Sequence, residues 1–153
     1  MLYIAADHRG FKLKEIIKAF LIKKETAAED MGDFSYDEEN DYTDFARNVA
    51  EEIMRNSGNK GILLCGSGHG MDITANKYKG VRAALCFNRQ MALESRAHED
   101  ANVLVLPADW ISDEQALEIV EIWLAKSFSG EERHIRRLGK IREIEEKNFK
   151  QNS

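Results

Sequence analysis

The stretch GILLCGSGHGMD, residues 61–72, contains the three parts that decide the fold class: a short apolar run, a glycine-rich loop and the polar start of a helix. The run ends at Cys65, after which glycines alternate with other residues as far as Gly70. An uninterrupted apolar run is typical of a strand that is buried on both faces of a parallel sheet. The stretch therefore predicts one strand-loop-helix unit of an α/β protein.

On either side of this stretch the same succession repeats. Short apolar runs alternate with longer segments in which apolar residues recur every three or four positions, as they do on the buried face of a helix. Strands are expected at residues 2–6 (LYIAA), 26–31 (a weak pattern), 61–65 (GILLC), 82–86 (RAALC) and 102–106 (NVLVL). Helices are expected at 11–24, around Phe45, Val49 and Ile53 after an acidic loop that includes 37–40, at 112–126 and at 133–148. This succession predicts a three-layer, Rossmann-like α/β fold with a five-stranded parallel sheet in flavodoxin-like order and an extended C-terminal helix.

Length and composition restrict the class of protein. A chain of 153 residues with 43% hydrophobic and 32% charged residues suits a single domain over 1–153, with a C-terminal helix at about 133–150. No apolar run approaches the roughly 18 residues that cross a bilayer. The start MLYIAADHRG reaches the charged residue Asp7 too early for the apolar region of a signal peptide, so we expect a cytoplasmic protein without a membrane partner. Cys65 and Cys86 have no disulfide or metal-ligand spacing, so we expect reduced thiols and no metal. A net charge of -5 argues against a nucleic-acid partner.

The predicted fold also indicates where a ligand binds. Ligands of open parallel sheets lie beyond the carboxyl ends of the strands, at the point where the strand order reverses. Strands one and three flank that point, and their ends carry DHRG (7–10) and CGSGHG (65–70). Backbone N–H groups at a helix start favour negative charge, which predicts a pKa of Cys65 below the usual value of about 8.5. The alternative is that Cys65 is a small core residue and that the glycines only allow a tight turn.

The other candidate residues also have two interpretations. Asp7 and His8 either cap the first helix or contact a ligand at the strand end. His98 is either a surface histidine at a helix end or a titrating functional group. Arg133 and Arg137, four residues apart on one side of a helix, either face solvent or hold a phosphate together. A base, a loop rich in donors, a histidine and two arginines suit proton abstraction next to the carbonyl of a phosphorylated substrate, without a metal.

Five segments of the chain closely resemble the family of ribose-5-phosphate isomerase B and galactose-6-phosphate isomerase. They are, in order, AADHRGFKLKE, DYTDFA, GILLCGSGHGMDITANKYKGVRAALC, RAHEDANVLVLP and GEERHIRRLGKI, and the match as a whole spans residues 3 to about 142. The resemblance implies a Rossmann-like fold and a cofactor-free aldose–ketose isomerisation of a sugar phosphate. It also implies a homodimer with shared active sites, or a dimer of such dimers.

The resemblance assigns roles around the reacting carbons of the sugar. Cys65 would be the base that moves a proton between C1 and C2, and the hydroxyl of Ser67 would serve O1 and O2 of the substrate. The enediolate would be stabilised by backbone N–H groups of the loop, at Gly66, Gly68 and Gly70. Removing one such donor typically costs on the order of 100-fold in rate.

The remaining roles concern the sugar ring and the phosphate. His98 would be the acid and base of ring opening, and Asp7 would assist at the ring oxygen. The phosphate ligands that the resemblance implies are His8, Arg133, Arg137 and the adjacent His134. Because these ligands would lie far from the reacting carbons, they would contribute binding energy and orientation rather than chemistry.

Four positions depart from the family pattern. Thr43 stands where many members have proline, and Met71 stands where one branch has a glutamate base, which favours Cys65 as the base here. Glu99 replaces a usual asparagine and would repel an anionic intermediate or bind a different hydroxyl, and His69 would add a donor or face solvent. These departures leave the identity of the substrate sugar undetermined. Interconversion of ribose 5-phosphate and ribulose 5-phosphate is the expected activity, and the alternatives are an isomerase of galactose 6-phosphate or allose 6-phosphate, or a catalytically silent sugar-phosphate sensor.

Overall fold

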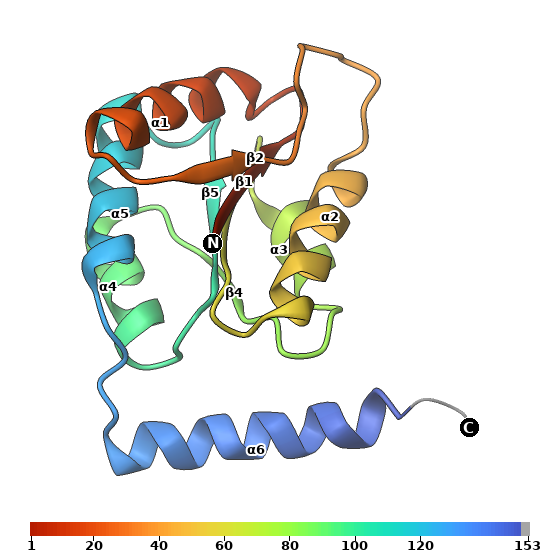
Figure 1. The fold of residues 1–153 in the computed structure, drawn as a ribbon, viewed down its shortest axis with the longest axis vertical. Coiled ribbons are helices and arrows are strands. Elements are labelled where there is room, and N and C mark those ends of the chain that lie inside the picture. Colours follow the sequence, from red (N-terminus) through yellow and green to blue (C-terminus); the bar gives the residue numbers. More distant parts are fainter. Residues whose placement is uncertain (151–153) are drawn as a thin grey trace.

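The computed structural model describes residues 1–150, in which strands and helices alternate as predicted (Figure 1). The elements are β1 (Leu2–Ala6), α1 (Phe11–Lys23), β2 (Ala28–Asp30), α2 (Tyr42–Arg55), β3 (Lys60–Cys65), α3 (His69–Ala75), β4 (Ala83–Leu85), α4 (Arg89–Ala97), β5 (Val103–Pro107), α5 (Asp113–Ala125) and α6 (Glu132–Asn148). The weakly patterned second strand is only three residues long. The last residues of the predicted single domain, 151–153, lie outside the described part of the chain.

The five strands form one parallel sheet in the order β2-β1-β3-β5-β4. This confirms the three-layer parallel fold and the adjacency of β1 and β3, where the strand order reverses. The prediction of a complete flavodoxin-like order is wrong at one edge, because that order would place β4 next to β3. All five residues of β5 are buried, whereas β4 is short and half-buried. The fully apolar strand therefore takes the internal position and the weaker one forms the edge.

Helices cover both faces of the sheet, and each face has its own apolar core (Figure 1). α1, α4 and α5 pack on one face, where Trp123 and Ile17 are fully buried. α2 and α3 pack on the other face, around Leu63 and Met71. Successive residues of β1 and β3 point to opposite cores, as the two-residue period of a strand requires. This arrangement leaves the carboxyl ends of β1 and β3 side by side between the two helical layers.

α6 differs from the other helices because it covers neither face of the sheet. It runs beyond the amino edge of the sheet (Figure 1), and His134 is its only buried residue. Glu145 accepts a hydrogen bond from the backbone N–H of Gly80 at 2.9 Å, which ties the far end of α6 to the segment before β4. No helix within residues 1–150 has the length and apolarity that crossing a membrane requires.

A buried ion pair attaches the end of β2 to α1. The side chain of Lys14 is fully buried, and its ammonium donates to Asp30 Oδ1 at 2.8 Å and to the carbonyl of Asp33. Burial acts to raise the pKa of Asp30, but hydrogen bonds from Lys14 and Lys18 outweigh it and lower the pKa of this carboxyl. The pair therefore stabilises the fold only while Asp30 is ionised.

Replacing Asp30 with asparagine should lower the free energy of unfolding at pH 7 by about 3 kcal/mol, because Lys14 would keep a buried charge without its partner. A lowered pKa in the folded state means that the stabilisation is complete above the ordinary carboxyl pKa of about 4 and is lost as the pH falls below it. Urea unfolding should therefore show a large difference from the parent protein at pH 7 and a much smaller one near pH 3. The matched control is Asp44→Asn, in an exposed pair with Arg47, which should change stability little.

Candidate active site

The end of β1 places Asp7 beside the end of β3. The backbone N–H of Asp7 donates to the carbonyl of Leu64 at 3.2 Å, which joins the two strand ends. Asp7 Oδ1 accepts the backbone N–H groups of Arg9 at 3.0 Å and Gly10 at 3.1 Å, so this carboxylate does cap the turn before α1. It is also only 4% exposed, and its charge acts on Cys65. The capping and the functional interpretations are therefore compatible.

The loop after β3 surrounds the thiol of Cys65 with backbone donors. The N–H groups of Met71, Gly68 and Gly70 act on this sulfur, which is buried at the strand end. Gly68 has a φ of 80°, in the left-handed region, and a Cβ at this position would collide with Leu85. The path that aims these donors at Cys65 thus requires glycine.

The pKa of Cys65 corrects one prediction. Burial raises the pKa of this thiol above its usual value, and the charge of Asp7 raises it further. The N–H groups of Met71, Gly68 and Gly70 lower it, but they do not compensate for the loss of hydration. The prediction that the helix start lowers the pKa of Cys65 is therefore wrong for a single copy of the chain, because desolvation outweighs the donors of the short helix α3. Burial raises the pKa of Cys86 to about 11, as for a core cysteine.

Ser67 lies on the open side of the same loop. Its hydroxyl accepts the backbone N–H of His69 at 3.3 Å, and both residues face a hollow of about 300 Å³. The hollow is lined by Ser67, His69, Leu85, Phe87, Pro107 and Trp110. This volume is at the lower limit of small-molecule sites. His69, whose role the sequence left open, is exposed at the mouth of this hollow.

His8 is held by a residue that the sequence analysis did not single out. Asn40 Oδ1 accepts the backbone N–H of His8 at 3.1 Å and lies 3.0 Å from the ring Nδ1. Asn40 belongs to the acidic loop 37–40, which carried no assignment. The only local signal was its place directly before the DYTDFA segment, 41–46.

A second overlooked feature covers Gly66. The guanidinium of Arg9 pairs with the carboxylate of Asp109, and a Cβ on Gly66 would overlap both side chains. This ion pair connects the loops after β1 and β5 over the start of the glycine loop. No sequence pattern could indicate it, because the two residues are 100 positions apart.

The other candidate residues gather around the start of α6. His98 ends α4, and its ring centroid lies 4.6 Å from that of His134. His134 is buried, and its Nδ1 is 2.7 Å from the hydroxyl of Ser129, so in this chain it packs against His98 instead of standing free for a phosphate. Arg133 and Arg137 are both exposed.

Two remaining side chains complete this second group. Glu99 is exposed next to His98. Arg133 Nε donates to Glu131 Oε2 at 3.0 Å, an exposed contact that leaves most of the guanidinium available. The group therefore consists of two exposed arginines, an exposed carboxylate and the half-buried His98.

The two groups lie at opposite edges of the sheet. Cys65 pairs with Pro107 at the carboxyl end of β5, whereas His98 precedes Val103 at the amino end. Those ends are about 13 Å apart along the strand, from four steps of about 3.3 Å. The start of α6 lies beyond the same amino edge (Figure 1). The structure thus brings Asp7, His8, Cys65, Ser67 and the loop together, and it leaves His98, Glu99, Arg133, His134 and Arg137 apart from them.

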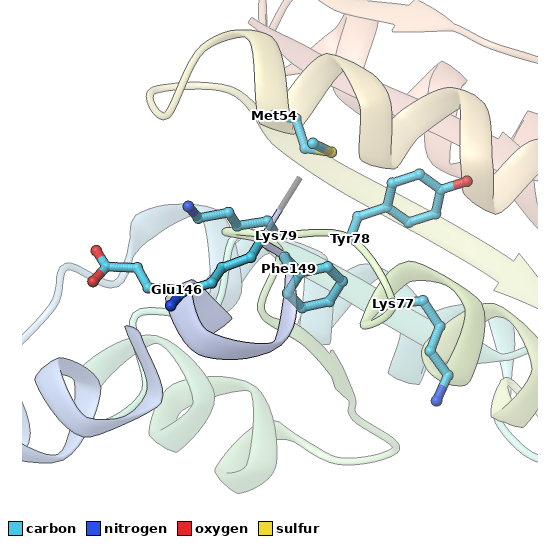
Figure 2. Close-up of a pocket in the computed structure, with 7 residues that line it drawn as sticks. Met54, Lys77, Tyr78, Lys79, Glu146 and Phe149 are labelled. Carbon is cyan, nitrogen blue, oxygen red and sulfur yellow. The ribbon is translucent and has the colours of Figure 1, made fainter. Parts of the chain in front are cut away.

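A larger hollow elsewhere has a different character. It has a volume of about 650 Å³, and Figure 2 shows its lining: Met54, Lys77, Tyr78, Lys79, Glu146, Phe149 and Lys150. The ammonium groups of Lys77 and Lys79 point in different directions, so the polar groups do not converge on one ligand (Figure 2). Because binding sites have convergent polar groups, the candidate site remains at the ends of β1 and β3.

Comparison with known proteins decides the family. The model of the family described as ribose/galactose isomerase matches residues 2–141 of the chain. The chain belongs to this family. Among curated relatives, the ribose-5-phosphate isomerase B of Escherichia coli is 38% identical over 141 residues, which cover 92% of this chain and 93% of that protein.

Solved structures of the family have the same fold as this isomerase-family chain. The ribose-5-phosphate isomerase B of Mycoplasma genitalium, solved with bound ribulose 5-phosphate, superimposes with a TM-score of 0.93 at 40% identity, over 96% of this chain and 97% of that one. The corresponding protein of Clostridium thermocellum gives a TM-score of 0.90 at 44% identity, over 95% and 97%. These likenesses confirm the family and the fold that the sequence motifs predicted.

Proposed function

We propose that the chain is an aldose–ketose isomerase that interconverts ribose 5-phosphate and ribulose 5-phosphate through an enediolate, without a cofactor. The observation that carries this proposal is the thiol of Cys65 beside the N–H groups of the glycine loop, at the point where the strand order reverses. Similarity to enzymes that are named for this reaction supports the choice of sugar. A metabolic enzyme with two free thiols also suits the cytoplasm.

The proposed proton transfer stays within one substrate molecule. Cys65 Sγ, as thiolate, removes the proton from C2 of the open-chain aldose, and the electron pair of that C–H bond forms the C1–C2 double bond of the enediolate. The negative charge moves to O1, where the backbone N–H groups of the loop stabilise it. The thiol then returns the proton to C1, and the hydroxyl of Ser67 moves a proton between O2 and O1. C1 is reduced and C2 is oxidised, so no external oxidant or reductant takes part.

Ring opening and phosphate binding are assigned to the remaining residues. His98 moves the proton of the ring hydroxyl, and Asp7 assists at the ring oxygen. His8, Arg133 and Arg137 bind the phosphate, far from the reacting carbons, where the binding energy positions the sugar. Glu99 and His134 lie next to His98, the first as a contact to a sugar hydroxyl and the second as a packing partner.

The active site is proposed to lie between two copies of the chain. Cys65 and His98 are at opposite edges of one sheet, so one chain does not present both to a single sugar. In a dimer with two-fold symmetry, each copy would provide Cys65 to one site and His98 to the other, which gives two equal sites. The exposed isoleucines Ile141 at 39% and Ile144 at 60%, three residues apart on one side of α6, provide an apolar surface that such a partner would cover.

The activity can be tested with a panel of sugar phosphates in heavy water. Incubation with ribose 5-phosphate should yield ribulose 5-phosphate and place deuterium at the exchanging carbon, as NMR would show. Faster turnover of galactose 6-phosphate or allose 6-phosphate would change the substrate of the proposal. Binding of a sugar phosphate without any exchange would instead support the sensor. The Cys65→Ala protein is the control for exchange that this site does not catalyse.

Removal of either exposed arginine, as Arg133→Ala or Arg137→Ala, should raise KM for ribose 5-phosphate by about 10- to 100-fold, because each loses a charge-assisted hydrogen bond. Activity toward ribose itself should change much less, since ribose has no phosphate. Arg142→Ala is the matched control, an exposed arginine on the opposite side of α6. Equal losses on both sugars would contradict the phosphate role.

A further inference from the structure

Asn40 contacts His8 through one oxygen atom and is itself held in place. Its Oδ1 accepts the backbone N–H of His8 and lies 3.0 Å from the ring Nδ1. Its Nδ2 donates to Asp33 Oδ2 at 2.8 Å. The backbone N–H of Asp33 donates to the carbonyl of Ala6 at 2.9 Å, so the chain of contacts returns to the end of β1. Lys14, which donates to the Asp33 carbonyl, attaches the same segment to α1.

These partners fix the orientation of the amide by their chemistry. The backbone N–H of His8 can only donate, and the ionised carboxylate of Asp33 can only accept. The amide oxygen must therefore face His8, and the amide nitrogen must face Asp33. With an acceptor 3.0 Å away, Nδ1 of His8 must carry a proton in both the neutral and the charged ring.

The other ring nitrogen, Nε2, is left for a ligand. Among residues 1–150 no hydrogen bond to Nε2 of His8 is formed. The ring of Tyr36 stands edge-on to the His8 ring at a centroid distance of 6.4 Å, and it also contacts Phe11 at 6.3 Å. Rotation of the imidazole is thus limited by an aromatic neighbour as well as by Asn40. Any proton that the ring gains or loses is carried by Nε2.

We propose that Asn40, oriented by Asp33, is a positioning residue that holds His8 in its Nδ1–H form and reserves Nε2 for the phosphate of the substrate. The identity of this ligand rests on the proposed function. When the phosphate dianion binds, Nε2 takes a proton from solvent and donates it to a phosphate oxygen as a hydrogen bond, while Nδ1–H stays on Asn40. The phosphate therefore meets a cationic donor whose direction is already set.

The tautomer of His8 can be measured without any substrate. In protein with ¹⁵N-labelled histidine, the neutral ring of His8 should show the Nδ1–H pattern, and the His8→Gln spectrum identifies its signals. Asn40→Ala should convert the ring to the Nε2–H form that free imidazole side chains prefer. The double variant Asp33→Asn/Asn40→Asp exchanges the amide and the carboxylate, so it keeps an acceptor for Nδ1 and one donor between the two side chains, and it should keep the Nδ1–H form. An Nε2–H ring in the parent protein would overturn the proposal, and that observation needs no variant to fold.

Binding measurements test the consequence. Asn40→Ala should raise KM for ribose 5-phosphate by about tenfold, with kcat changed less than about threefold, and should weaken inhibition by orthophosphate to a similar degree. The double variant Asp33→Asn/Asn40→Asp should recover most of this loss. Glu39→Ala, an exposed neighbour in the same loop, should leave both values unchanged.

Unchanged phosphate binding in Asn40→Ala, or an equal loss in the double variant Asp33→Asn/Asn40→Asp, would show that Asn40 acts only as loop structure. If the protein isomerises none of the sugars, the proposed function fails, but the tautomer and the orthophosphate titration can still be read. The two failures are therefore distinguishable.

Discussion

Cys65→Ala should lower kcat for isomerisation by about 10³-fold while leaving the affinity for the sugar phosphate nearly intact. The reason is that a general base acts in the transition state and contributes typically 10²- to 10⁴-fold, whereas the ground-state complex depends on the phosphate contacts. Cys65→Ser should be almost as inactive, since a hydroxyl is far harder to deprotonate than a thiol. Steady-state kinetics and calorimetric titration would give the two quantities separately.

The matched control for this substitution is Cys86→Ala. Cys86 is also buried, but it lies in the other core, and burial raises its pKa to about 11, so its loss should leave kcat near the parent value. Near-normal turnover of Cys65→Ala would show that another group is the base.

The pH dependence gives a second test of the same assignment. Burial and the charge of Asp7 raise the pKa of Cys65, so the thiol is mostly protonated at pH 7. The thiolate is the active form, and its fraction grows about tenfold per pH unit below the pKa. The value of kcat/KM should therefore increase with pH above neutrality and level off once the thiol is ionised. The residual activity of Cys65→Ala should lack this rise, and a rise that persists in the variant would belong to another group.

A mixture of two inactive proteins, Cys65→Ala and His98→Ala, should regain roughly a quarter of the parent activity after they are unfolded and refolded together. Random pairing makes half of the dimers mixed, and each mixed dimer has one site with both residues intact and one with neither. This follows from the positions of Cys65 and His98 at opposite edges of the sheet. Activity should be measured per dimer, with mixed dimers quantified by mass spectrometry.

The control for this experiment pairs two substitutions from the same edge. A mixture of Cys65→Ala and Ser67→Ala should stay inactive, because every site of its mixed dimers lacks one of the two residues. If the Cys65→Ala and His98→Ala mixture also stays inactive although mixed dimers form, both residues must act within one chain. That result would remove the shared site and keep the isomerase.

The fold class and the location of half of the site could be read from contiguous residues. Apolar runs such as 61–65 are buried whichever elements cover them, and parallel strands end at one edge, so Asp7 and Cys65 had to lie near each other. The separation of His98 from Cys65 follows from the same alternation, because a helix between parallel strands runs back to the opposite edge. The family motifs occur in these segments, which is why the family could be identified from the sequence.

What the sequence could not provide depends on contacts between distant segments. β5 takes the internal position and β4 the edge of the sheet because the strands compete for the fully buried place. The raised pKa of Cys65 follows from how much water the packed chain excludes. The contact of Asn40 with His8 joins residues 32 positions apart, and the pair of Arg9 and Asp109 joins residues 100 apart. Hydrophobic periodicity describes which face of an element is buried, but desolvation and hydrogen bonding depend on which other element comes to lie against that face.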